Sequence, residues 1–157
     1  MVHDIASLKE LSLAEQLARV SRLWKMVADR ELAPLGLTHP RWTALWKLRR
    51  LGDNVSQKSL AEALEIELPS LMRTLNQLEE QSLVTRYSCK SDKRARIVRL
   101  TEDGKSLLKQ MEEKIVEVRS QILNNISDEE IKMLSSILDR VSQSALEALS
   151  QKSETLE

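Results

Sequence analysis

Four polar side chains between residues 70 and 77 are of the types that read the edges of nucleic-acid bases. Ser70, Arg73, Thr74 and Gln77 are spaced at i, i+3, i+4 and i+7, so a helix places them on one side. Arginine pairs with guanine through two hydrogen bonds and glutamine with adenine, whereas serine and threonine reach bases or phosphates. An ordinary amphipathic surface helix has a similar polar stripe, so this pattern needs support from its neighbours. The predicted apolar side consists of Leu71, Met72, Leu75 and Leu78.

A cluster of positive charges follows within a short distance. Six cations lie within fourteen residues, and among these residues only Asp92 opposes them. Residues 83–89 and 95–100 are rich in Val, Thr, Tyr and Ile, which predicts a two-stranded hairpin with residues 90–94 at its tip. Such a tip can enter a minor groove, where narrow A·T-rich tracts concentrate negative potential. A charged edge that prevents aggregation is the alternative, but six positive charges exceed that need. The six cations are Arg86, Lys90, Lys93, Arg94, Arg96 and Arg99.

The elements that must position these side chains are mostly helices. Apolar periodicity and capping patterns predict helices over residues 12–33, 38–51, 56–64, 68–81, 101–124 and 127–149. Two short helices with a tight connection, from Ser56 to about Gln81, have the pattern of a helix-turn-helix. Helix starts present unpaired N–H groups to phosphates, so the starts of both short helices join the candidate DNA contacts, with Ser56 and Gln57 at the first and Pro69 in the first turn of the second.

The predicted fold is therefore mainly α, a winged helix-turn-helix flanked by long N- and C-terminal dimerisation helices. We expect the winged domain at residues 38–101, the helical dimerisation region at 7–37 and 102–149, and a polar, frayed tail at 150–157. Apolar residues spaced by three and four run along residues 108–122 and 131–145, as in the seams of coiled coils. A self-contained helical layer is the alternative to a homodimer, but long helices at both ends suit two intertwined copies. A dimer also places two reading helices one DNA turn apart on a pseudo-palindrome.

Composition narrows the class of protein further. The net charge of zero conceals a segregation, since residues 38–100 carry 12 basic and 7 acidic side chains and the rest carry 12 and 17. The excess of five positive charges favours a polyanionic partner. Two histidines and the single Cys89 offer no recognisable catalytic or metal-binding set, so we expect neither an enzyme nor a cofactor. No secretory signal or membrane span is predicted, which favours a cytoplasmic, nucleoid-associated protein. A winged-helix module that binds protein instead of DNA remains the alternative.

Several segments together resemble the MarR family of bacterial transcription regulators, and most closely its SlyA/RovA branch. The serine–aspartate–basic–arginine run followed by a strand and Leu-Thr is the most specific signature, and the match covers residues 12–149. The segments that carry it are residues 35–38 with Trp42, Gln57 with residues 60–61, residues 66–75, residues 77–80, residues 91–94 and residues 100–101.

The resemblance implies roles for particular residues. Arg73 matches the arginine of the reading helix, and Asp92 and Arg94 match a pair in the wing, where we expect Asp92 to fix the shape of the tip. Lys93 stands where this branch usually has a minor-groove arginine. Lysine is more strongly hydrated, which leaves the strength of A·T-tract preference open.

The resemblance also implies a cleft for a small aromatic carboxylate between the dimer helices and the DNA-binding lobe. Cations and indoles near that place suit an acid and a ring, although helical spacing equally suits tryptophans that pack in a core. Cys89 as a redox switch is a further implication, with inert packing as its alternative. The candidate cleft residues are Arg22, Trp24, Lys25, Arg41, Trp42 and Trp46.

Overall fold

The computed structural model describes residues 11–52 and 54–153 of the chain. These residues form two compact units, one ending at Ile122 and the other beginning at Leu123. Residues 7–10 of the predicted dimerisation region and 154–157 of the predicted tail lie outside the described residues. The mainly helical winged-helix fold expected from the sequence is confirmed.

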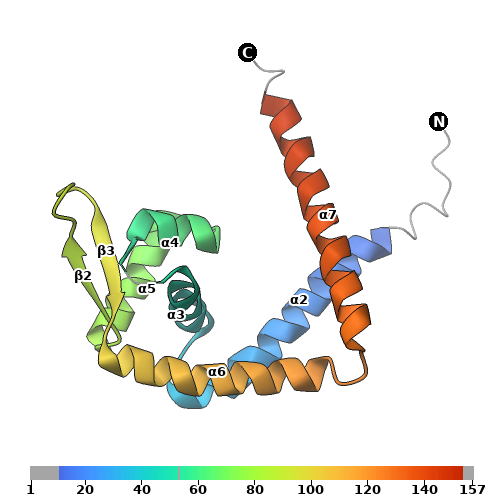
Figure 1. Cartoon of the computed structure of the whole chain (residues 1–157), viewed down its shortest axis with the longest axis horizontal. Helices are drawn as coiled ribbons and strands as arrows, with labels where there is room; N and C mark the ends of the chain where they lie inside the picture. The colour runs from blue at the N-terminus through green and yellow to red at the C-terminus, as the bar shows by residue number, and fades with distance from the viewer. Residues whose placement is uncertain (1–10, 53, 154–157) are drawn as a thin grey trace. The chain divides into compact units, whose positions relative to one another are not determined.

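The first unit consists of five α-helices, a short 3-10 helix and a small sheet within the described residues (Figure 1). Proline in the first turn begins α3 and α5, where its missing N–H costs nothing. Gly36 ends the 3-10 helix at φ 75°, a left-handed conformation that suits glycine. The elements are α2 (Leu11–Leu32), η1 (Ala33–Leu35), α3 (His39–Leu51), β1 (Val55–Ser56), α4 (Gln57–Leu64), α5 (Leu68–Glu80), β2 (Val84–Ser88), β3 (Arg96–Leu100) and α6 (Glu102–Ile122).

The sheet has one strand more than the sequence predicts. The predicted hairpin of β2 and β3 is present, with Arg86 of β2 opposite Val98 of β3. The additional strand β1 pairs with the other edge of β3, where Val55 lies opposite Val98, so β3 is the central strand. Two residues are too few for an alternating pattern, so β1 carries no signal in the sequence. This strand closes the wing against the start of α4 and thereby fixes the hairpin to the helix-turn-helix.

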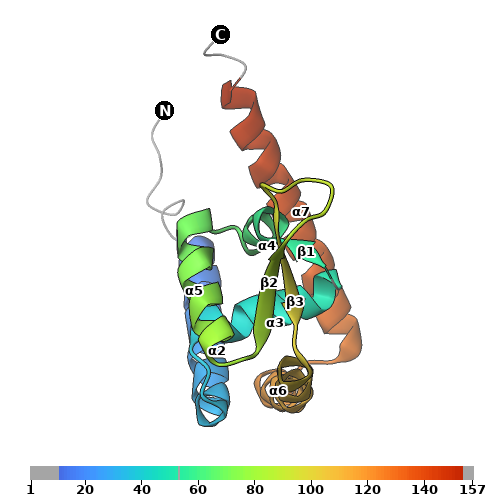
Figure 2. The same cartoon turned by 90° about the vertical axis from the view of Figure 1, so that its left-hand side faces the viewer.

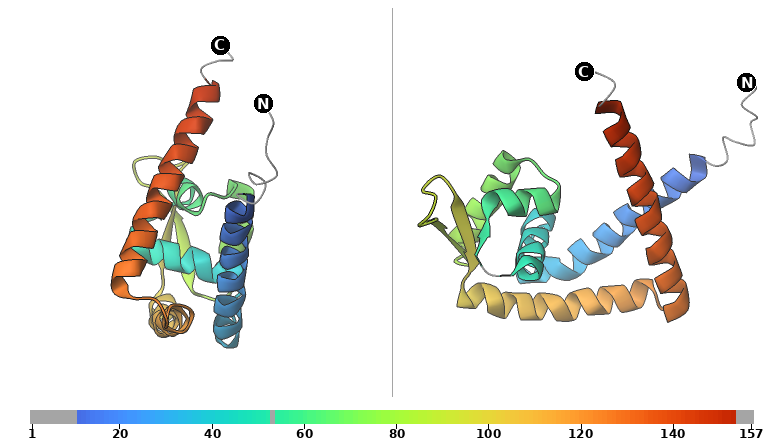
Figure 3. Two further views of the ribbon diagram at one scale, coloured as in Figure 1. Left: turned by 90° about the vertical axis from the view of Figure 1, so that its right-hand side faces the viewer. Right: turned by 45° about the horizontal axis from the view of Figure 1, so that its top comes forward.

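The core lies where α3, α4, α5 and the sheet meet α6. Leu45, Leu60, Leu71 and Leu75 are fully buried there. The apolar seam predicted for residues 108–122 packs against other elements of its own chain, since Leu108, Met111 and Val118 are buried. Figure 3 shows α6 running beside α2, and the two helices are in contact. The seam of α6 is therefore largely used within one copy.

The second unit contains α7 (Asp128–Ser153) within the described residues. A capping box begins this helix as predicted, because Ser127 Oγ accepts a hydrogen bond from the Glu130 N–H and Glu130 Oε2 accepts one from the Ser127 N–H. The prediction of a frayed tail from residue 150 is wrong as far as Ser153, since α7 continues through it. Ser12 and Glu15 also have the sequence pattern of a capping box, but Ser12 does not begin α2, since the helix already includes Leu11.

Candidate nucleic-acid interface

The helix α5 presents an exposed polar face away from the core. Leu71, Leu75 and Leu78 are buried, as their spacing predicts. Figure 2 shows α5 and the β2–β3 hairpin on the same side of the molecule. Both elements can therefore meet one extended partner at once. The exposed predicted contacts of α5 are Pro69, Ser70, Arg73 and Gln77.

Two assignments on α5 are wrong. Thr74 is only 7% exposed, and its hydroxyl donates to the carbonyl of Ser70 over 3.3 Å, so it does not share the exposed face. Met72, predicted to be apolar core, is 42% exposed. Helical periodicity defines the centre of each face, whereas the neighbouring elements decide which flank is covered. Here α5 packs against α3 and α4, and in this packing Thr74 is buried whereas Met72 stays exposed.

The start of α4 stabilises the helix-turn-helix from inside. Ser56 Oγ accepts a hydrogen bond from the Ser59 N–H over 3.0 Å, and so acts as an N-cap. Gln57 is 8% exposed, and its Oε1 accepts from Arg86 over 3.4 Å. Gln57 was predicted to contact DNA, but its side chain is buried and bonded within the protein. Phosphate binding by the α4 start remains a prediction.

The tip of the wing is exposed and held in shape by Asp92. Asp92 Oδ1 accepts a hydrogen bond from the Arg94 N–H over 3.0 Å, and the Asp92 carbonyl accepts one from the Ala95 N–H. This bond is the internal tie expected for Asp92. Within the described parts of the chain, four cations around the tip form no ion pair, and each is exposed; they are Lys90, Lys93, Arg94 and Arg96.

The other two cations of the hairpin are turned to the protein itself. Arg86 pairs with Glu79 of α5. Arg99 donates two hydrogen bonds to Asn54 Oδ1, at 3.1 and 2.8 Å, and its guanidinium lies 5.2 Å from the centre of the Tyr87 ring. Tyr87 OH also donates to Asn54 Oδ1. Composition could not distinguish these two structural arginines from the four that face solvent.

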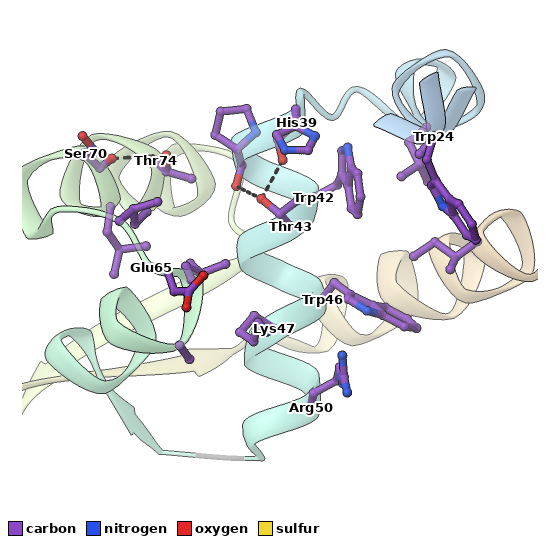
Figure 4. A pocket seen from close by; sticks show the side chains of 18 of the residues that line it. Trp24, His39, Trp42, Thr43, Trp46, Lys47, Arg50, Glu65, Ser70 and Thr74 are labelled. Atoms are coloured by element: carbon purple, nitrogen blue, oxygen red, sulfur yellow. Dashed lines mark hydrogen bonds between the residues drawn. The ribbon is translucent and has the colours of Figure 1, made fainter. Parts of the chain in front are cut away.

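A large cleft of about 1090 Å³ lies beside α5 within the first unit. Figure 4 shows Trp24 of α2, Trp42 and Trp46 of α3, and Ser70 and Thr74 of α5 around it. The prediction that Arg22, Lys25 and Arg41 line this cleft is wrong, since none of the three is among its lining residues. Arg41 is instead hydrogen-bonded to Thr38 and Gln81. The cations that do line it are Lys47, Arg50, Arg73 and Arg119.

Asp29 of α2 holds one of the tryptophans that line this cleft, Trp42. Its Oδ1 accepts from Trp42 Nε1 over 2.8 Å and lies 3.2 Å from His39 Nδ1. Trp42 and Trp46 also pack against the core, so they serve as cleft lining and core at once. The sequence pattern allowed both roles for these residues, and the structure combines them.

Cys89 lies at the base of the wing tip with its sulfur 3.1 Å from Ser91 Oγ. Hydrogen bonds from the Ser91 hydroxyl, and from the backbone at Ser91 and Asp92, lower the pKa of the Cys89 thiol below its ordinary value. Because the thiolate is the nucleophile, alkylation should set in at lower pH than for an ordinary thiol. We expect iodoacetamide rates, followed against pH by mass spectrometry, to show this shift.

The variant Ser91→Ala should move the alkylation midpoint of Cys89 to higher pH, since it removes the largest cause of the lowered pKa. Ser88→Ala is the matched control, because the hydroxyl that meets the sulfur belongs to Ser91. Equal midpoints in the wild type and Ser91→Ala would contradict the expectation.

Together, the fold, the exposed face of α5 and the cationic wing define a winged-helix transcription regulator. Comparison with known proteins agrees. A model of the MarR family matches residues 37–95. The crystal structure of the transcriptional regulator PA3341 is 33% identical, with a TM-score of 0.79 over 86% of this chain and 98% of that one. The chain belongs to the MarR family.

Two more distant structures share the fold. A mutant of MarR from E. coli, complexed with operator DNA, has a TM-score of 0.78 at 22% identity, over 85% of this chain and 95% of that one. CouR from Rhodococcus jostii RHA1, bound to p-coumaroyl-CoA, has a TM-score of 0.74 at 21% identity, over 82% of this chain and 90% of that one.

Neither a membrane span nor a metal-binding cluster occurs among the described residues. No helix in residues 11–52 and 54–153 is long and apolar enough to cross a membrane. In the same residues, no group of three or more His, Cys, Asp or Glu side chains could hold a metal ion.

Proposed function

We propose that this regulator binds pseudo-palindromic, A·T-rich DNA as a homodimer, with α5 in the major groove and the wing in the minor groove. The observation that carries the proposal is the exposure, on one side of the first unit, of Arg73 and the four cations of the wing tip. Arg73 supplies a bidentate donor for guanine. The cations supply contacts to phosphates and to a narrow groove. The complex of E. coli MarR with operator DNA supports this arrangement by analogy of fold.

Salt titration of DNA binding tests this proposal. A protein that neutralises several phosphates releases counterions, so affinity should fall by about 10³-fold or more between roughly 50 and 200 mM salt. We expect this steep, linear log–log dependence in fluorescence anisotropy with a random duplex. An absence of binding at low salt would overturn the proposal and favour the alternative, a winged helix that binds protein.

Two apolar helix faces support a second copy of the chain as partner. On α2, Leu13 and Val20 are 59% and 55% exposed, and on α7, Leu134 and Val141 are 49% and 47% exposed. Exposed apolar rows of this length are typical of surfaces that are buried by association. Since the seam of α6 is already covered within one chain, α2 and α7 are the helices left to form the dimer.

The double variant Leu134→Glu with Leu138→Glu should convert the protein to a monomer, because it places four charges in a buried symmetric interface. Analytical ultracentrifugation at micromolar concentration measures this change. Ser136→Glu is the matched control, since Ser136 lies on the other side of α7 and should leave the dimer intact. A double variant that still sediments as a dimer would place the interface elsewhere.

We further propose that the large cleft binds a small aromatic acid. Trp42 and Trp46 offer faces for a ring, and Arg50 and Arg119 offer charge for a carboxylate. CouR bound to p-coumaroyl-CoA is an example of a ligand on this fold. Quenching of tryptophan fluorescence by salicylate, with salicylamide as the uncharged control, tests this assignment. Equal affinity for both compounds would exclude a carboxylate site.

A further inference from the structure

Arg86 joins the wing to both helices of the helix-turn-helix. Its side chain is 16% exposed. The guanidinium donates to Glu79 Oε2 at 3.0 and 2.5 Å, to Asn76 Oδ1 at 2.6 Å and to Gln57 Oε1 at 3.4 Å. These partners lie on α5 and α4, whereas Arg86 lies on β2. One side chain therefore ties three elements together.

The contact with Asn76 fixes which end of its amide faces outward. Arginine has only donors, so the group of Asn76 that meets it must be the carbonyl oxygen and cannot be the NH₂. The amide oxygen and nitrogen lie on opposite sides of the same carbon. The two N–H donors of Asn76 are consequently directed away from Arg86.

Asn76 also lies on the exposed face of α5. It follows Arg73 by three residues, so the two side chains are about 60° apart around the helix axis. Both are exposed, and the buried Leu71, Leu75 and Leu78 occupy the opposite side. The sequence did not predict Asn76 as a contact, because helical spacing placed it in neither the polar set of α5 nor its apolar set.

We propose that Asn76 determines specificity at one base pair of each half-site, and that Arg86 is its positioning residue. The inference rests on the proposed binding of α5 in the major groove. With its oxygen engaged by Arg86, Asn76 presents donors and best matches base edges that offer acceptors without an amino donor beside them, namely O6 and N7 of guanine or O4 of thymine. It disfavours cytosine, whose major-groove edge offers only the N4 amino donor.

The variant Asn76→Asp tests this assignment directly. A carboxylate keeps an oxygen for Arg86 but replaces the outward donors with an acceptor. Selection from a randomised duplex library should therefore change one base in each half-site from guanine or thymine to cytosine or adenine, which carry amino donors. We expect preference ratios between about fivefold and a hundredfold. Gln81→Glu, an equal change of charge at the end of α5, is the matched control and should leave the selected site unchanged.

The result separates this inference from the proposed function. If the wild-type protein shows no salt-dependent DNA binding, the proposed function fails. If it binds DNA but the wild type, Asn76→Asp and Asn76→Ala select the same site, only the assignment of Asn76 is overturned.

The positioning role of Arg86 has its own test. Arg86→Lys offers a single ammonium group that cannot keep the geometry of three acceptors. It should reduce discrimination at the base that Asn76 reads, and should have no further effect at that base in an Asn76→Ala background. Equal loss of affinity for all sequences, with the base preference unchanged, would indicate a purely structural role. Arg49→Lys, at an exposed position of α3 outside the proposed DNA-binding surface, is the control for an arginine-to-lysine change and should leave the base preference unchanged.

Discussion

Replacing Arg73 with alanine is expected to relax sequence discrimination much more than it weakens binding to random DNA. Arg73 is exposed on α5, and no ion pair or hydrogen bond engages its side chain among the described residues. A bidentate arginine–guanine contact contributes about 1–3 kcal/mol of discrimination, which is about a fivefold to hundredfold change in the affinity ratio. Competition anisotropy with a selected site and a scrambled duplex measures this ratio.

Lys93→Ala provides the contrast to Arg73→Ala. Lys93 lies at the exposed tip of the wing, and a phosphate contact carries no sequence information. We expect a similar decrease in affinity for both duplexes, and a log–log salt slope that is smaller by about 0.9 for each phosphate that is no longer neutralised. If both variants keep wild-type affinity for the selected site, the DNA-binding surface has been assigned to the wrong face.

Gly104→Ala is expected to destabilise the protein, although alanine normally favours a helix over glycine by about 1 kcal/mol. A Cβ atom at Gly104 would lie 2.1 Å from the carbonyl oxygen of Leu83. That oxygen also accepts the Thr101 N–H over 3.1 Å, so the clash can be relieved only by moving backbone at the junction of α5, β2 and α6. We expect a loss of about 3 kcal/mol in the free energy of unfolding.

Urea unfolding followed by circular dichroism measures the effect at Gly104, with protomer concentration held constant because the proposed dimerisation would add to stability. Ser106→Ala, two residues along the same helix and exposed, should change the free energy of unfolding by less than about 0.5 kcal/mol. Equal stabilities for the two variants would mean that α6 can shift away from Leu83 at little cost.

The sequence predicts the helices and the hairpin because both produce regular spacing. Leu71, Leu75 and Leu78 recur with the period of a helix, and all three are buried. The wing is predicted by its β-branched residues and its dense positive charge, and its tip is exposed as expected. Local chemistry also predicts the bond between Asp92 and the turn, because it spans only two residues.

The errors concern contacts between different elements of the fold. Arg86 and Arg99 have the pattern of DNA-binding cations, yet their partners Glu79 and Asn54 come from other elements. The same applies to Thr74, which is buried by neighbouring elements and not by its own helix. A one-dimensional pattern indicates which residues can face inward, but the neighbours that cover them are set by the tertiary fold.

The cleft beside α5 has a thermodynamic consequence. Arg73 both lines this cleft and lies on the exposed face of α5, so an occupant that engages its guanidinium withdraws it from DNA. Reciprocity then requires that DNA lower the affinity of the occupant by the same factor by which the occupant lowers that of DNA. A coupling of about 1–3 kcal/mol, typical of such linked sites, corresponds to about a 5- to 150-fold change. Release of DNA and uptake of the occupant would thus be two readings of one equilibrium.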